Sequence, residues 1–376
     1  MKKISFIHTA DLHLGLPLQK WLDSAELTLL RKKDYLATFF RILNVVKEKK
    51  VPFFFIAGDF LEHGFVQSET VFLVKEELGK LPCNVFIAPG NHDPYRDDSF
   101  YCSKWPRNVH IFKGAWENIY FKDYDLTILG KGFTDFLECN SSLPQKPKSS
   151  NVILIAHATF LQTKVASKCL YFPLYKEDLL FLKPNYVALG HIHKPSMFKL
   201  EDKLKNKIIV CYPGSPEGLC WKELGKRYIV HGVLENGLLT LNNIEIHTRT
   251  LEKVSCDISA LYSFKDILEV LLKELANFDK ESFFEICFLG RRQETLDMFL
   301  LKDFLVQNLK HSYPFFKIQN ATYPDFDLDF YRKDIGVIGK FINRFDKLLE
   351  EKPAEKELIQ AALYKGLEAL LWNRKN

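Results

Sequence analysis

Five short segments of this 376-residue sequence carry side chains of the kinds that bind metal ions. Each segment directly follows a short apolar run that is typical of a buried strand. The segments are Asp11-Leu12-His13, Gly58-Asp59, Gly90-Asn91-His92-Asp93, His157, and Gly190-His191-Ile192-His193. Carboxylate, amide and imidazole groups suit Mn²⁺, Fe or Zn²⁺, whereas the lack of cysteine in these segments argues against a structural zinc site.

The spacing within the segments favours convergence on one site. Asp11 and His13, like His191 and His193, are two residues apart and therefore point the same way if the backbone is extended. A glycine before Asp59 allows a tight turn at the strand exit. One carboxylate such as Asp59 can bridge two divalent ions, which offsets their repulsion and holds them about 3.5–4 Å apart.

Coincidence is the alternative explanation for any single segment. A D-x-H or H-x-H pattern occurs by chance, and a lone histidine is more often a hydrogen-bonded core residue than a ligand. All five segments in this order, each after an apolar strand, favour the metal site over coincidence.

The elements that position these segments are predicted to form an α/β domain. Runs rich in Val, Ile or Phe predict strands over residues 4–8, 53–57, 84–88, 152–156, 186–189 and 207–212. Apolar residues at helical spacing predict a helix over 26–49, so the chain starts as a β–α–β unit. Loops at the carboxyl ends of strands in such a sheet share one rim, where residues far apart in sequence can meet.

The rest of the chain predicts further domains. Closely spaced strands are expected over 109–129, a hairpin over 227–246, and an exposed loop over 141–150. Residues 249–325 alternate strand and helix as a small α+β unit, and 326–376 contain two helical patterns. We therefore predict three domains, 1–248, 249–325 and 326–376.

The composition favours a soluble cytoplasmic protein. With 52 basic and 47 acidic side chains, the net charge of +5 permits a polyanionic partner without requiring one. The eight cysteines form no C-x-x-C pair, which favours free thiols in a reducing compartment. No apolar run is long enough for a membrane span, and polar residues from His8 onward interrupt any signal peptide, so we expect no membrane association.

The ordered motifs D-x-H, G-D, G-N-H-D/E, H and G-H-x-H resemble those of the calcineurin-like metallophosphoesterase superfamily. Within it, the sequence is similar to the SbcD-type DNA repair nucleases and, more closely, to their YhaO-like bacterial branch. The similarity is carried by HTADLHLG at 8–15, AGDF at 57–60, GNHDPYRDDSFY at 90–101, WPRNVHIF at 105–112, GHIHKP at 190–195, YPGSPEG at 212–218 and ALYKGLEALL at 362–371. The resemblance implies a four-layer α/β/β/α metallophosphoesterase core with a small α+β capping domain and C-terminal helices.

The resemblance also implies roles for the motif residues and two divalent ions per chain. One ion is expected on Asp11, His13, Asp59 and His193, and the other on Asp59, Asn91, His157 and His191. His92 is expected to be the catalytic residue that contacts the scissile phosphate or the leaving oxygen, and Asp93 either orients His92 or serves only as a turn residue. We expect Mn²⁺, with Mg²⁺, Fe or Zn²⁺ as alternatives.

One position departs from the family pattern. Eukaryotic and archaeal relatives place a histidine three residues after the G-D aspartate, where it guides the 3′ end of DNA. This chain has Glu62 at that position and His63 after it. Either His63 substitutes, or it is simply solvated, so cleavage polarity stays open.

Arg96, Arg107 and Ser215 are candidates for contacts with DNA phosphates. Ser215 lies in a Pro/Gly-rich loop that the family uses near its site, although such a sequence is also an ordinary turn. A basic triplet at 31–33 could contact phosphates too, but a triplet on a helix is more often a solvated face.

The last predicted helix carries an apolar stripe, which could dock on its own domain. The resemblance implies instead that it binds the coiled-coil base of an SMC-like ATPase of the SbcC or YhaN type. The residues concerned are Ile359, Leu363, Leu367, Leu370 and, as an aromatic anchor, Trp372. Relatives also imply a homodimer.

We therefore expect a divalent-metal-dependent DNA nuclease, exo- and/or endonucleolytic, that acts with this ATPase in double-strand-break repair. One alternative is a small-molecule or phosphoprotein phosphoesterase of the same fold, against which the extra domain and tail argue. Another is a non-catalytic DNA-end scaffold, against which the complete ligand set argues.

Overall fold

The computed structural model describes residues 2–18, 25–138, 143–163, 171–201, 207–293 and 296–372. The chain divides into two compact units, Met1–Leu251 and Glu252–Asn376. In the described part of the first unit, two mixed sheets contain six strands each.

The first sheet has the order β14-β13-β1-β2-β3-β4. Its strands are β1 (Ile4–Thr9), β2 (Phe53–Ile56), β3 (Asn84–Ile87), β4 (Val109–Ile111), β13 (Tyr228–Glu235) and β14 (Leu238–Glu245). Strands β1 to β4 run parallel, and β13 pairs antiparallel with β1. Because β1, β2 and β3 are parallel, the first three predicted ligand segments leave the sheet at the same edge.

The second sheet has the order β11-β12-β10-β7-β6-β5. Its strands are β5 (Glu117–Phe121), β6 (Leu126–Lys131), β7 (Asn151–His157), β10 (Tyr186–Gly190), β11 (Ser196–Glu201) and β12 (Lys207–Tyr212). The four central strands run parallel, and β5 and β11 are antiparallel edges. His157 ends β7, and the segment from Gly190 follows from β10, so the remaining predicted ligands also leave at carboxyl ends.

An aromatic core lies between the two sheets, whose inner faces pack against each other. Its main members are Phe6, Phe53, Phe55, Phe86, Leu126, Ile128, Ile153, Ile155 and Tyr186. Full burial of each such side chain contributes roughly 1.5–3 kcal/mol. This burial explains why the strands read as continuous apolar runs.

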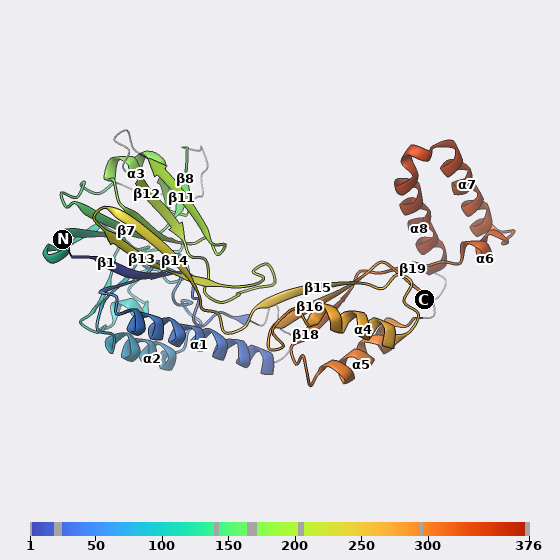
Figure 1. The fold of residues 1–376 in the computed structure, drawn as a ribbon, viewed down its shortest axis with the longest axis horizontal. Coiled ribbons are helices and arrows are strands. Elements are labelled where there is room, and N and C mark those ends of the chain that lie inside the picture. Colours follow the sequence, from blue (N-terminus) through green and yellow to red (C-terminus); the bar gives the residue numbers. More distant parts are fainter. Residues whose placement is uncertain are drawn as a thin grey trace. The chain divides into compact units, whose positions relative to one another are not determined.

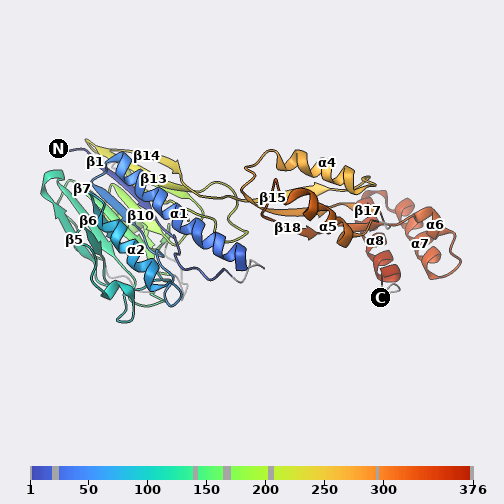
Figure 2. The ribbon, with the colours of Figure 1, turned by 90° about the horizontal axis from the view of Figure 1, so that it is seen from below.

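Helices cover the outer faces of both sheets. Helices α1 (Ala25–Lys49) and α2 (Ser68–Gly79) lie next to each other over the first sheet (Figures 1 and 2). Helix α3 (Lys176–Leu182) packs Leu179 and Leu182 into the apolar cluster on the outer face of the second sheet. The expected four-layer α/β/β/α fold is therefore confirmed.

The predicted strand spacing between 109 and 129 is only partly correct. Strands β5 and β6 form an antiparallel hairpin, but β4 pairs with β3 in the other sheet. The chain therefore crosses from one sheet to the other after β4. The predicted hairpin at 227–246 is present as β13 and β14, whose turn has Asn236 at φ 52° and Gly237 at φ 77°.

Smaller elements complete the first unit. They are the parallel pair β8 (Thr159–Leu161) and β9 (Pro173–Tyr175), and the 3₁₀ turns η2 (Phe100–Cys102) and η3 (Lys122–Tyr124). Residues 143–150 of the predicted loop contain neither helix nor strand, and its first residues lie outside the described ones.

The second unit begins with a small α+β fold. Its elements are β15 (Leu251–Asp257), α4 (Phe264–Leu275), β16 (Phe283–Leu289), α5 (Met298–Leu309) and β18 (Phe316–Asn320). The sheet order is β15-β16-β18, and both helices bury leucines in one apolar cluster with the strands. A short parallel pair, β17 (Arg291–Gln293) and β19 (Tyr323–Asp325), adds to the predicted pattern.

Helices form the end of the described chain. They are α6 (Leu328–Arg332), α7 (Val337–Glu351), the 3₁₀ turn η4 (Pro353–Glu355) and α8 (Lys356–Trp372). Helices α7 and α8 share a separate apolar cluster. Among the described residues, no helix combines the length and apolar character that a membrane crossing requires.

Candidate metal centre

The loops after β1 and β2 remain paired beyond the ends of the strands. The amide of Asp11 donates to the Gly58 carbonyl over 3.0 Å, and that of His13 donates to the Asp59 carbonyl over 2.9 Å. This pairing continues the parallel ladder into the loops. It brings two predicted ligands from the first segment beside the one from the second.

Four of the predicted ligands have an unusual backbone conformation. The φ angle is 55° at Asp11, 48° at His13, 48° at Asp59 and 99° at His191. Such angles are unfavourable for residues with a Cβ and cost about 1–3 kcal/mol each. They persist where the surroundings determine the conformation, which is typical of functional sites.

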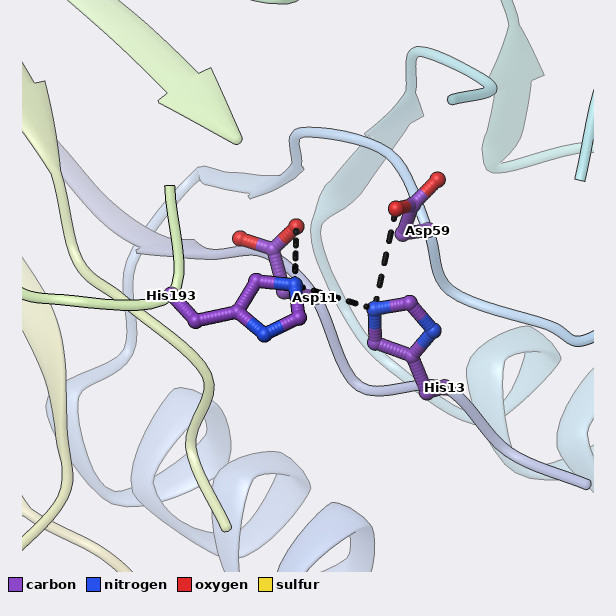
Figure 3. A group of neighbouring side chains, drawn as sticks. All are labelled: Asp11, His13, Asp59 and His193. Atoms are coloured by element: carbon purple, nitrogen blue, oxygen red, sulfur yellow. Dashed lines mark hydrogen bonds and ion pairs between the residues drawn. The ribbon is translucent and has the colours of Figure 1, made fainter. Parts of the chain in front are cut away.

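The first predicted ligand group is assembled in the structure (Figure 3). Ligand atoms of Asp11, His13, Asp59 and His193 all lie within 4.8 Å of one another. The Nε2 atom of His13 is 3.4 Å from Nε2 of His193 and 3.6 Å from Oδ2 of Asp59. Two residues from one loop thus meet one residue from each of two other loops, those after β2 and β10, as the spacing predicted.

The second predicted group also meets at Asp59. The Nε2 atom of His157 is 3.3 Å from Asp59 Oδ2 and 3.0 Å from Asn91 Oδ1. The ring of His191 lies 5.2 Å from that of His157. Burial, helped by His157, lowers the pKa of His191 to about 4, which keeps it neutral and able to coordinate. Since Asp59 Oδ2 approaches both groups, its position fits a bridging ligand.

Three ligand histidines are held through their other ring nitrogen. The contacts are His13 Nδ1 to Glu62 Oε1 at 2.6 Å, His193 Nδ1 to Glu223 Oε1 at 2.8 Å, and His157 Nδ1 to the Ala57 carbonyl at 3.0 Å. Each acceptor requires Nδ1 to donate its proton, which leaves Nε2 as the lone-pair nitrogen that faces the site. Such outer contacts fix the tautomer and the ring orientation of metal-bound histidines.

The donor set therefore fits divalent metal ions. Asp11 is fully buried, yet its Oδ2 has no hydrogen-bond partner among the described residues. An unpaired carboxylate oxygen in such a place is costly unless a cation satisfies it. Asp11, His13, Asp59 and His193 would hold one ion. Asp59, Asn91, His157 and His191 would hold the other.

Two glycines are required because ligands pack directly against them. A Cβ on Gly90 would lie 2.2 Å from Asp59 Oδ1, and one on Gly58, whose φ is +84°, would lie 2.3 Å from His157 Nδ1. Both distances are far below van der Waals contact, so only glycine fits at these positions.

His92 lies beside the two groups and is about half exposed. Its amide donates to Asp59 Oδ1 over 2.9 Å, and its Nδ1 lies 3.1 Å from Glu62 Oε2. The hydrogen bond to Glu62 raises the pKa of His92 to about 9. A cationic ring at this position can stabilise negative charge on a phosphate oxygen.

Asp93 has a different role from either of the two expected. Its Oδ1 accepts the amides of Gly90 and Asp59, and its Oδ2 accepts those of Phe60 and Leu61. The hydroxyl of Tyr101 also donates to Oδ2 over 2.6 Å. Asp93 therefore fastens the G-N-H-D loop to the Asp59 loop, while Glu62 orients His92.

The calcineurin-like phosphoesterase family matches residues 4–195, which is half of the chain and spans every one of these ligand segments. The chain belongs to this family. Members of this family use divalent metal ions, and the two groups around Asp59 form the candidate metal centre of this chain. All seven predicted ligands and His92 fall inside the matched range.

Three curated relatives are similar over much of the chain. The Bacillus subtilis protein "Uncharacterized metallophosphoesterase YhaO" is 27% identical over 68% of this chain and 64% of its own length. The "DNA double-strand break repair protein Mre11" of Archaeoglobus fulgidus is 27% identical over 71% and 65%, and that of Methanopyrus kandleri is 25% identical over 58% and 49%. The chain thus spans less than two thirds of the length of each relative.

The three predicted DNA-contact residues differ in their placement. Arg96 is on the surface but pairs with Asp98 at 3.1 Å and Asp135 at 3.0 Å. Arg107 is exposed in the loop before β4. Ser215 is fully buried and its hydroxyl donates to Glu223 over 2.6 Å, so it supports the partner of His193 instead of facing a phosphate.

Two basic residues that the sequence left open have structural partners. Arg31 is fully buried and contacts Glu217 at 2.7 Å and Asp34 at 3.0 Å, which excludes it from contacts with DNA. His63 lies 3.5 Å from Asp98 and packs its ring against Phe136. It does not take the place of Glu62 beside the metal ligands.

The apolar stripe of α8 is mostly buried within its own segment. Ile359, Leu363 and Leu367 are at most 7% exposed, and the last two share a cluster with Ile338 and Ile342 of α7. Leu370 is partly exposed, and the side chain of Trp372 lies outside the described residues. Docking of α8 on α7 therefore accounts for most of the stripe.

Proposed function

We propose that this phosphoesterase is a divalent-metal-dependent nuclease that hydrolyses phosphodiester bonds in DNA. The observation that carries the proposal is the shared Asp59 oxygen between two ligand groups, with the half-exposed His92 beside them. Two of the relatives are named as DNA double-strand break repair proteins, which supports DNA as the substrate and repair as the process.

The side chains of this centre have separable tasks. When bound, two divalent ions supply an activated water and neutralise charge in an in-line displacement. His92 donates a hydrogen bond to the phosphate or to the leaving oxygen. Glu62 holds that ring in place from its Nδ1 side, and Arg107 and Arg96 contact the DNA backbone. We propose Mn²⁺ as the native ion, with Mg²⁺, Fe or Zn²⁺ as alternatives.

We further propose that the protein is cytoplasmic and works with an SMC-like ATPase of the SbcC or YhaN type, as a homodimer. Residues 249–325 would act as a capping and DNA-binding domain, and 326–376 as the ATPase-binding segment. Because the stripe residues face α7, the partner would contact the outer surface of this segment. Phe330, Ile335, Val337 and Leu358 supply large apolar side chains there, each at least 66% exposed.

A nuclease assay tests the proposal. The full chain loaded with Mn²⁺ is incubated with end-labelled duplex and hairpin DNA, with and without the ATPase, and with p-nitrophenyl phosphate and a cyclic dinucleotide as small substrates. We expect cleavage of DNA, with turnover reduced about 10²–10⁴-fold in His92→Ala at unchanged metal content. Asp59→Ala should lose both metal and activity, because it removes the shared ligand.

Three outcomes would contradict the proposal in different ways. Turnover of only the small substrates would indicate a small-molecule phosphoesterase. Binding of DNA ends without turnover of any substrate would indicate a scaffold. Equal metal loss in His92→Ala and Asp59→Ala would refute the separation of catalytic and ligand roles.

A further inference from the structure

A basic cavity lies at the opposite end of the first sheet from the metal centre. It has a volume of about 830 Å³. Its lining comes from the start of β1, the end of α1, the turns before β2 and β3, and β13 beside β1. The metal ligands follow the carboxyl ends of the same strands. With about 3.3 Å per residue, eight residues from Lys3 to Asp11 separate the two places by roughly 25 Å.

Four lysines line this cavity. They are Lys3, Lys47, Lys49 and Lys50. None of them forms an ion pair with any described residue, whereas the neighbouring Lys2 pairs with Asp123 at 2.7 Å. Like charges gathered around one concave space raise the local positive potential. The pKa of His231, which also lines the cavity, is lowered by burial and then by Lys49 and Lys3, which is the effect expected of that potential.

A structural explanation covers only part of this arrangement. Lysines in the last turn of a helix interact favourably with its dipole, which accounts for Lys47 and Lys49 at the end of α1. The helix dipole does not account for Lys3, which directly precedes β1. Nor does it account for Lys50, whose φ of 49° places a lysine where glycine is usual after a helix.

The remaining wall offers hydrogen-bonding and apolar groups. Ser5 Oγ and His231 Nε2 lie 3.0 Å apart at one side. Val51, Pro52 and Tyr124 also line the cavity. A volume of this size is typical of small-molecule sites, which combine apolar walls with a few polar groups.

We propose that this cavity binds a compact polyphosphate anion, supplied either as a nucleoside triphosphate or as inorganic polyphosphate. Lysine ammonium groups on flexible stems act as point charges that suit clustered phosphates without demanding one geometry. The apolar wall beside Tyr124 would receive a nucleobase where one is present. The site is separate from the metal centre and does not depend on the proposed nuclease activity.

Calorimetric titration of the metal-loaded full chain tests the proposal, with inorganic triphosphate and a non-hydrolysable nucleoside triphosphate as probes. The metal centre can bind both probes, but it contributes equally to the wild type and to variants far from it. In Lys49→Glu/Lys50→Glu we expect the loss of one equivalent of bound probe, or at least tenfold weaker binding. The control Lys199→Glu/Lys207→Glu changes the net charge equally on exposed residues of β11 and β12 and should bind within twofold of the wild type.

A second variant tests whether weaker binding in Lys49→Glu/Lys50→Glu comes only from unfolding of the last turn of α1. Lys3→Glu lies on the strand side and should weaken binding in the same direction. All variants should keep wild-type hydrolysis of a simple phosphodiester. Tighter binding of the nucleoside triphosphate than of the inorganic probe would identify a nucleotide site, and equal binding a site for the phosphates alone. Equal affinity of the probes for the cavity and control variants would overturn the proposal. So would the absence of binding of either small probe to the wild type, together with binding of duplex DNA that the cavity variants lose.

Discussion

Glu62 contacts two histidines that have different tasks. One carboxylate oxygen accepts from the metal ligand His13 and the other from His92. The residue therefore couples the position of a candidate metal ligand to the position of the proposed catalytic histidine. No pattern in the sequence predicted this coupling, because it depends on where the loop after β2 places the side chain.

Replacing Glu62 by glutamine should impair both tasks. The amide keeps one acceptor oxygen, but its NH₂ group cannot accept from the second ring nitrogen. Loss of such outer contacts reduces metal affinity or activity by about 10–100-fold. We expect weaker Mn²⁺ binding by calorimetry and a lower kcat in Glu62→Gln, and a larger loss in Glu62→Ala. The matched change Glu69→Gln, at an exposed position on α2, should have no effect. Wild-type affinity and turnover in Glu62→Gln would show that neither histidine depends on it.

Burial of His8 should make the free energy of unfolding depend on pH. It is fully buried, its Nδ1 lies 2.8 Å from the Tyr186 hydroxyl, and burial lowers its pKa to about 3 from an ordinary value of 6.5. Between pH 6.5 and 3 the unfolded chain binds a proton at His8 that the folded chain does not. The contribution of His8 to the free energy of unfolding is therefore fully present above pH 6.5 and falls as the pH drops towards 3. Between pH 7.5 and 5 the loss from this residue is about 2 kcal/mol.

Urea unfolding of His8→Asn at pH 7.5 and 5 measures this contribution. The variant keeps a hydrogen-bonding group beside Tyr186 but cannot titrate, so its stability should change less between the two values than that of the wild type. His311→Asn, at an exposed position, should keep the wild-type dependence. An unchanged difference in His8→Asn would contradict the neutral buried state.

At the scale of elements, the strands were predicted well from the sequence, because strands buried on both faces consist of continuous apolar runs. The predicted strand at 207–212 has the bounds of β12, and that at 4–8 is one residue shorter than β1. The ligand segments were found because each follows such a run. The pairing of β4 was missed, since three partly buried residues carry no signal for the sheet that they join. Glu223 was missed for a similar reason, because its role depends on a contact with His193 across the fold.

Gly90 lies in the loop that follows β3 and should not tolerate a side chain. In Gly90→Ala the new Cβ would meet Asp59 Oδ1 at 2.2 Å and the Asp59 amide nitrogen at 2.6 Å. The shared ligand would have to move, so we expect loss of bound metal by elemental analysis together with a lower melting temperature. Gly64→Ala is the control: its φ is +78° but nothing lies within 4 Å of the added Cβ, so only backbone strain of about 1–2 kcal/mol is expected. Full metal content in Gly90→Ala would mean that the loops are not locked together.

At the scale of the whole molecule, the tail has buried apolar side chains that pack its helices and exposed ones that we propose bind a partner. Leu363 is 1% exposed and holds α8 on α7, whereas Leu358 on the same helix is 69% exposed. The apolar stripe in the sequence could not distinguish these functions, because any amphipathic helix has such a stripe whichever surface covers it.

Two substitutions in α8 test this division. Leu363→Ala should destabilise the helical segment by about 2–5 kcal/mol, because it leaves a cavity in a small cluster. Leu358→Lys should leave thermal unfolding unchanged and weaken binding of the SMC-like ATPase in a pull-down with purified partner. Undiminished binding by a folded Leu358→Lys would place the partner surface elsewhere.

We propose that seven side chains from five segments hold two ions that share Asp59. Anomalous diffraction at the manganese edge, from crystals of the full chain grown with Mn²⁺, tests it directly. We predict two peaks about 3.5–4 Å apart. One should contact Asp11, His13 and His193, the other should contact Asn91, His157 and His191, and Asp59 should lie between them. A single peak, or two peaks that do not share Asp59, would contradict the account.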